Sequence, residues 1–168
     1  AFSALNDIPT RSQIYWGSTS YREALRLDPA SVRAVNNLAD LLVHQGTGLE
    51  EAVGLAERGV ALAEAEWTRL LRDHDASENL ELRADLVKRL HRTLLEYLSA
   101  LGTLGQARRA RGDATGAIEA WRTALRLAPE TMQEYRARRH CEIAEVLEDG
   151  SRDEAVRRLD TASALTTY

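Results

Sequence analysis

Residues 105–129, GQARRARGDATGAIEAWRTALRLAP, restrict the possible folds of this chain more than any other stretch. They predict the second half of one helix, a short turn at Gly112-Asp113 and a second helix that ends at Pro129. Small residues stand where two helices must approach closely, and large apolar residues stand between them. The small residues are Gly105, Ala117 and Ala124, and the large ones are Leu101, Leu104, Trp121, Leu125 and Leu127. The pattern indicates a closely packed helical hairpin.

The same stretch resembles the tetratricopeptide repeat, whose pattern is W-x2-L-G-x2-Y, then A-x3-F, then A and P. The matching positions are Leu101, Leu104, Gly105, Ala117, Trp121, Ala124 and Pro129. Arg108 departs from the pattern, because the family prefers an aromatic residue there. The resemblance covers most of residues 8–165 and is strongest at 101–129. It implies an all-α, right-handed solenoid of antiparallel helix hairpins.

Repeat boundaries follow from this resemblance, and they predict a single tetratricopeptide-like domain over residues 1–168. Two of its parts, 32–63 and 98–131, are repeats. The other parts are a partial repeat at 1–29, an elongated hairpin or degenerate repeat at 64–97, and a degenerate repeat at 132–168.

The segment between the two repeats has two interpretations. Apolar residues recur in constant phase over 49–72 and again over 80–111, separated by DHDASEN. Constant phase predicts two long antiparallel helices, each roughly 35–50 Å long at 1.5 Å per residue, which project as one hairpin. The alternative is a degenerate repeat with turns near Ala63 and Ser99, where a turn should shift the apolar phase.

The last part of the chain fits the repeat least well. We expect a helix over 132–148, a turn at Asp149-Gly150-Ser151 and a final helix that contains Ala155, Leu159, Ala162 and Leu165. The spacing back from this turn places Arg139 and Glu142 where the repeat pattern requires large apolar residues.

Charge and composition argue against several classes of function. The net charge of −4 gives no reason to expect nucleic-acid binding. Apolar runs are only a few residues long, so direct membrane insertion is not expected. Cys141 is the single cysteine and excludes an internal disulfide. No signal peptide is visible, so the sequence leaves the compartment open, with the cytoplasm favoured over the periplasm. The chain begins with Ala rather than Met, which fits a trimmed N-terminus or a fragment of a longer chain.

Catalytic motifs are missing from the sequence. It contains no Gly-rich phosphate loop, no H-E-x-x-H and no C-x-x-C. The four histidines, His44, His74, His91 and His140, fall on separate predicted elements. We therefore expect no enzymatic activity, no cofactor and no metal site.

A binding groove is implied by the resemblance, since the first helix of each repeat lines the inner face of such a solenoid and the family usually binds peptides there. The polar residues expected to face it are Arg33, Asn36, Asn37, Asp40 and His44 in the second repeat, Ser99, Thr103, Gln106 and Arg109 in the third, and His140, Cys141 and Glu148 in the fourth. Asparagine can bridge a peptide backbone and arginine can bind a carboxylate. The alternative is that these residues form ordinary solvated helix faces.

Two details bear on the ligand. Asn37 is similar in position to the asparagine of family members that hold a C-terminal carboxylate, but Ser99 and Thr103 do not match the rest of that clamp. Arg108, Arg109 and Arg111 complement a helix C-terminus, or alternatively form an anion site.

The expected function is a non-catalytic scaffold that presents its groove to a protein or peptide partner. The alternative is a structural subunit packed into a larger assembly through open repeat ends, which expose apolar surface.

Overall fold

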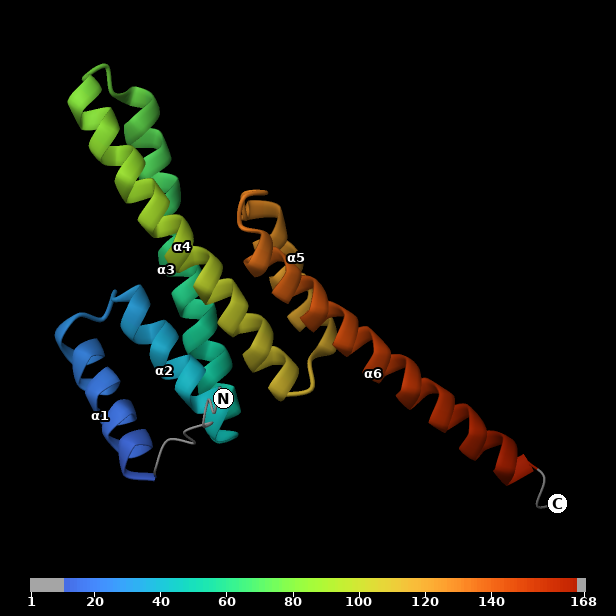
Figure 1. The fold of residues 1–168 in the computed structure, drawn as a ribbon. Helices are drawn as coiled ribbons and strands as arrows, with labels where there is room; N and C mark the ends of the chain where they lie inside the picture. The colour runs from blue at the N-terminus through green and yellow to red at the C-terminus, as the bar shows by residue number, and fades with distance from the viewer. Residues whose placement is uncertain (1–10, 166–168) are drawn as a thin grey trace, which may run out of the picture.

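The computed structural model describes the backbone of residues 11–165 and the side chains of residues 17–151. Within these limits the chain forms six α-helices and no strand, which confirms the all-α prediction (Figure 1). The helices are α1 (Arg11–Leu27), α2 (Val32–Gln45), α3 (Leu49–Ala76), α4 (Leu80–Ala110), α5 (Ala114–Leu127) and α6 (Gln133–Leu165). The side chains of Ala155, Leu159, Ala162 and Leu165 lie outside the described set.

Helix ends coincide with residues that satisfy free backbone groups. The Asn79 carboxamide oxygen accepts a hydrogen bond from Leu82 N at 3.0 Å and begins α4. Asp113 likewise accepts one from Gly116 N at 2.9 Å and begins α5. At the end of α2, Gly46 adopts φ 63°, a left-handed conformation that favours glycine.

A long antiparallel hairpin of α3 and α4 dominates the fold. At 1.5 Å per residue, α3 is about 42 Å long and α4 about 46 Å. Ala63 and Ser99 both lie inside these helices, so the turns required by the alternative interpretation are not there. In Figure 1 the distal half of the hairpin projects beyond the other helices, while its base packs against α2 and α5.

The core at this base is built around Trp121, whose side chain is fully buried (0% exposed). Ala117 and Ala124, one turn on either side of it, are also buried, as the small-residue pattern predicts. The indole Nε1 donates a hydrogen bond to Gly102 O at 3.3 Å. Gly105 lies directly against the ring, and a Cβ there would overlap the indole nitrogen. The missing side chain therefore makes room for the tryptophan.

Helix α6 corrects one prediction. It is continuous from Gln133 to Leu165, so the expected turn at Asp149-Gly150-Ser151 and the separate last helix were wrong. Gly150 is not among the described glycines with positive φ. Ser151 Oγ donates to Leu147 O at 3.0 Å, which satisfies the hydroxyl within the helix. Glycine and serine thus permit a turn here without enforcing one.

Alanine substitutions test this continuity. A Cβ at Gly150 or at Gly112 would meet no atom within 4 Å, but Gly112 has φ 88°. We expect Gly150→Ala to raise the helix content and to add about 0.5–1 kcal/mol to helix stability, since alanine favours helices. Gly112→Ala should destabilise the chain by about 1–2 kcal/mol because of its left-handed backbone. Circular dichroism and urea unfolding measure both effects. A loss of helix content in Gly150→Ala would indicate a turn instead.

Candidate binding groove

Three adjoining hollows lie along α4 and together form what we call the groove. The first, about 460 Å³, lies between α2 and α4. The second, about 410 Å³, is lined by α2, α4 and α6. The third, about 570 Å³, lies between α4 and α6 above Trp121. Neighbouring hollows share lining residues, namely Asn36, Asn37, Leu95 and Ser99 for the first two, and Gln106 and Arg138 for the last two.

The groove is long enough for an extended peptide. Its lining along α4 begins at Arg92 and ends at Ala110. These 18 helical steps (110 − 92) correspond to about 27 Å at 1.5 Å per residue. An extended chain rises about 3.3 Å per residue, so about eight residues span this length.

Helices α4 and α6 run in the same direction at a constant offset. Tyr135 OH donates to Leu98 O at 2.8 Å, and these residues are 37 positions apart. Farther along, Gln106 Nε2 donates to Glu142 Oε1 at 3.3 Å, and Arg109 Nη1 donates to Glu145 Oε2 at 2.7 Å, both at a separation of 36. A constant offset along both helices indicates parallel packing.

Most of the predicted groove residues on α2 and α4 line these hollows. They are Arg33, Asn36, Asn37, Asp40, Ser99, Thr103, Gln106 and Arg109. His44 does not, since its exposed ring lies at the end of α2 with Nδ1 2.9 Å from Asp40 O. On α6, Cys141 lines the third hollow, whereas His140 and Glu148 are exposed and line none of the three.

The residues of α6 that do line the groove were mostly missed. They are Tyr135, Arg138, Arg139, Cys141, Glu142 and Glu145, and Met132 joins them from just before the start of α6. A usable signal was present, because Arg139 and Glu142 stand out as charged residues at positions where the repeat pattern requires large apolar ones.

Arg139 is the most deeply buried charge in the groove (4% exposed). Its Nη2 donates to Glu142 Oε1 at 3.1 Å, and its Nε lies 3.0 Å from Glu142 Oε2 without hydrogen-bond geometry. The guanidinium lies 5.2 Å from the centre of the Tyr135 ring, a cation–π distance. A Cβ at Gly102 would come within 2.7 Å of Nη1, so this glycine admits the arginine. Burial raises the pKa of Tyr135 to about 12.

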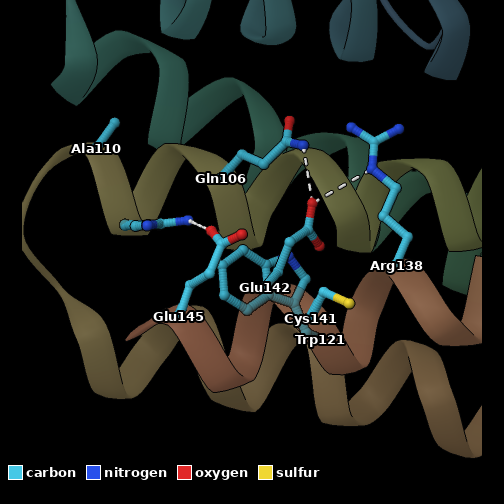
Figure 2. Close-up of a pocket in the computed structure, with 8 residues that line it drawn as sticks. Gln106, Ala110, Trp121, Arg138, Cys141, Glu142 and Glu145 are labelled. Atoms are coloured by element: carbon cyan, nitrogen blue, oxygen red, sulfur yellow. Dashed lines mark hydrogen bonds and ion pairs between the residues drawn. The ribbon is translucent and has the colours of Figure 1, made fainter. Parts of the chain in front are cut away.

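Figure 2 shows the side chains that line the third hollow from α6. Glu142 receives the Gln106 amide and also lies 3.5 Å from Arg138 Nε. Glu145 lies one turn farther along α6 and pairs with Arg109, while the Trp121 ring lies beneath. These charges balance one another within the third hollow.

The arginines at the end of α4 join helices. Arg108 Nη2 lies 3.0 Å from Glu57 on α3, and Arg108 Nη1 donates to Gly116 O on α5 at 3.3 Å. Arg111 pairs with Glu50 at 3.1 Å. Together with the Arg109–Glu145 pair, these contacts engage every guanidinium of the cluster. Arg108 therefore connects α3, α4 and α5 at the position where the repeat pattern has an aromatic residue.

Asn36 occupies the boundary of the first two hollows and is only partly satisfied. Its Nδ2 donates to Ser99 Oγ at 3.2 Å, while its buried Oδ1 has no hydrogen-bond partner. Asn37, beside it on α2, is exposed. Asn37 therefore places a free carboxamide in this part of the groove, whereas the unpaired oxygen of Asn36 is buried.

Arg33 and Arg92 line the first hollow from α2 and from α4. Both are exposed, and neither forms an ion pair or a side-chain hydrogen bond with any residue whose side chain is described. Glu96 is the only acidic residue in that lining. The first hollow therefore has a formal charge of +1 (two arginines minus one glutamate) on a chain whose net charge is −4.

The described residues contain no group of three His, Cys, Asp or Glu side chains placed to hold a metal ion. Of the helices in that part of the chain, none is both long enough and apolar enough to cross a membrane. No protein-family model matches the sequence, and comparison with curated proteins gives no match. A role for the groove therefore rests on its own residues and geometry.

Proposed function

We propose that this chain is a non-catalytic interaction module that binds an extended segment of a protein partner in the groove along α4. The observation that carries the proposal is the convergence of polar side chains from three helices on one continuous groove. These side chains come from segments that are far apart in sequence but line adjoining hollows, namely residues 33–40 of α2, 92–109 of α4 and 135–145 of α6.

A tetratricopeptide-like solenoid is the architecture we propose for it. The offset of 36–37 residues between α4 and α6 is close to the 34-residue period of that family. In this arrangement α2, α4 and α6 are the first helices of successive repeats, and α3 and α5 are the second helices. The superhelix of the proposed solenoid is right-handed. The elongated α3–α4 hairpin departs from its regular period, since the hydrogen-bonded pair of Asn36 on α2 and Ser99 on α4 lies 63 residues apart.

The chemistry of the groove suits a peptide backbone. The exposed carboxamide of Asn37 offers an amide donor and a carbonyl acceptor, which match the C=O and N–H groups of an extended chain. Leu95, Met132 and Tyr135 add apolar contact area beside them. A mixed polar and apolar lining supports binding of a short linear segment.

A second candidate function, a structural subunit, is favoured by the tip of the long hairpin. Four large apolar residues are exposed there, Leu71, Leu80, Leu82 and Val87. Apolar side chains gathered at a projecting tip suit packing against another subunit.

Two variants of the full chain separate these functions. The groove variant replaces Arg33, Asn36 and Asn37 together by alanine. The tip variant replaces Leu80 and Leu82 by alanine. Selection from a phage library of random eight- to twelve-residue peptides should enrich peptides that bind the wild type. We expect these peptides to bind the groove variant at least tenfold more weakly, because a few interface residues that contact the ligand carry most of the binding energy. Fluorescence anisotropy of the synthesised peptides measures this.

The tip variant is the matched control and should bind the same peptides with unchanged affinity. Equal affinity of the groove variant and the wild type would reject the groove as the binding site. Loss of binding in the tip variant alone would favour the second candidate.

A further inference from the structure

We infer that the projecting half of α4 binds a second copy of this chain, with the two α4 helices antiparallel. This contact is separate from peptide binding in the groove. Residues of α4 that are spaced alternately by four and three positions form one row, which we call the seam. Such spacing places side chains on one face of a helix and is typical of the contact between two packed helices. The seam consists of Leu80, Ala84, Val87, His91, Leu94, Leu98, Leu101 and Gly105.

The C-terminal half of the seam already packs against another helix. Leu98 and Leu101 are buried in one cluster with Ala124 of α5. Gly105 lies against the ring of Trp121 on the same helix. As residue numbers rise along α4 they fall along α5, so α5 lies antiparallel on the seam. This half shows that the seam accepts an antiparallel helix.

The N-terminal half of the same seam is uncovered. Leu80 is 80% exposed and Val87 is 52% exposed, and Ala84 and His91 are exposed as well. In Figure 1 this half of α4 projects beyond the other helices. It extends over 11 helical steps (91 − 80), or about 17 Å at 1.5 Å per residue. Apolar side chains that continue a buried helix contact into solvent indicate a site for a further helix.

The charges beside the uncovered seam show which helix fits it. Each of its four residues is followed by a charged residue, and the order is acid, acid, base, base. These residues are Glu81, Asp85, Lys88 and Arg92. All are exposed, and none forms an ion pair or a side-chain hydrogen bond with any residue whose side chain is described. A row of charges in this order is complementary to the same row in the reverse direction.

A second α4 in antiparallel orientation presents that reversed row. The two seams match when Ala84 of one copy lies opposite Val87 of the other. The ion pairs that form in this register are Glu81–Arg92 and Asp85–Lys88, and twofold symmetry makes each pair occur twice. A parallel pair would instead place every charge opposite its own counterpart. Charge complementarity therefore favours an antiparallel second copy as the occupant.

Sedimentation equilibrium of the full chain, from micromolar to near-millimolar concentration, measures this association. A single helix contact of this length is smaller than a standard interface of about 800 Å² per partner, so we expect a dimer that dissociates on dilution. The test variants are Asp85→Lys and Lys88→Asp, and neither of these residues lines the groove. Each variant places like charges opposite each other twice, which should weaken the dimer roughly 10-fold or more.

An equal mixture of Asp85→Lys and Lys88→Asp is the decisive sample. In the heterodimer each lysine faces an aspartate of the other copy, so the mixture should dimerise about as strongly as the wild type. The matched controls are Glu119→Lys and Arg122→Asp, which make the same charge changes at the same spacing on exposed positions of α5. Neither control should change the dimer.

The apolar part of the seam is tested at its centre. Val87→Glu would bury two carboxylates in the dimer and should weaken it roughly 100-fold or more. Leu82→Glu is the control, because Leu82 is as exposed as Val87 (50% against 52%) but lies off the seam. It should leave the dimer nearly unchanged.

A chain that stays monomeric at every concentration would overturn the inference, and so would a dimer that Val87→Glu does not weaken. Failure of the mixed variants to recover the dimer would also overturn it, because the charges would then not face each other across two copies. The phage-selected peptides keep the groove separate from these outcomes. Equal peptide affinity of Val87→Glu and the wild type would leave the proposed function intact whether or not the dimer forms.

Discussion

Gly105→Ala is expected to lower the free energy of unfolding by about 3 kcal/mol, at the upper end of the usual effect of overpacking a core. The new Cβ would overlap the Trp121 indole at its nitrogen and at two ring carbons. Because this ring is fully buried and bonded to Gly102 O, it cannot move without opening the contact between α4 and α5. The higher helix propensity of alanine, about 1 kcal/mol, offsets only part of the loss.

Gly54→Ala provides the control for this prediction. Gly54 also lies inside a helix, but a Cβ there meets no atom within 4 Å. We expect a gain of about 0.5–1 kcal/mol from helix propensity alone. Urea unfolding followed by circular dichroism measures both variants. A similar stability change in the two would show that Trp121 does not pack against Gly105 as described.

Glu142→Gln is expected to destabilise the chain by about 3 kcal/mol, because it leaves the charge of Arg139 buried without a counter-charge. The Arg139 side chain is only 4% exposed, and Glu142 is the acid within ion-pair distance of it. Arg139→Met removes the charge and fills the space with an apolar side chain, so its effect should stay below about 1.5 kcal/mol. The double variant should resemble Arg139→Met, which gives a coupling energy of about 3 kcal/mol, the full effect of Glu142→Gln.

Glu145→Gln is the matched control one turn farther along α6. Glu145 also pairs with an arginine, at 2.7 Å from Arg109, but both side chains are more exposed than the Arg139 pair. We expect an effect below about 1 kcal/mol, as for other surface ion pairs. Equal and small effects of Glu142→Gln and Glu145→Gln would mean that Arg139 is solvated rather than buried.

The core of the hairpin at 105–129 could be predicted because its chemistry leaves few alternatives. Gly105 must lack a side chain because the fully buried Trp121 ring lies directly against it. Ala117 and Ala124, one turn on either side of Trp121, are also fully buried, so their side chains must be small. The long hairpin could also be predicted, since a constant apolar phase leaves no place for a turn at Ala63 or Ser99. In both cases local pattern and packing favour the same structure.

The last helix could not be predicted in the same way. Asp149-Gly150-Ser151 is compatible with both a turn and a helix, and only packing decides between them. The assumed turn also set the register of α6, which placed His140 and Glu148 in the groove. Its lining instead includes Arg138, Arg139 and Glu142.

The buried Arg139–Glu142 pair shows why charge pattern alone is a poor guide to burial. Each residue by itself suggests a solvated face. Together they neutralise each other, Gly102 makes space for the guanidinium, and Tyr135 covers it. Gly102 lies on α4, far in sequence from the other three residues, which lie on α6. The arrangement therefore becomes visible only when α4 and α6 are placed side by side.

Hydrogen exchange of the full chain, with and without the phage-selected peptide that binds most tightly, is the decisive test of the groove as the binding site. A peptide bound in the groove should slow exchange in its lining, residues 33–40, 92–109 and 135–145, and leave exchange at the hairpin tip unchanged. Protection confined to residues 67–87, with the groove unaffected, would contradict this expectation.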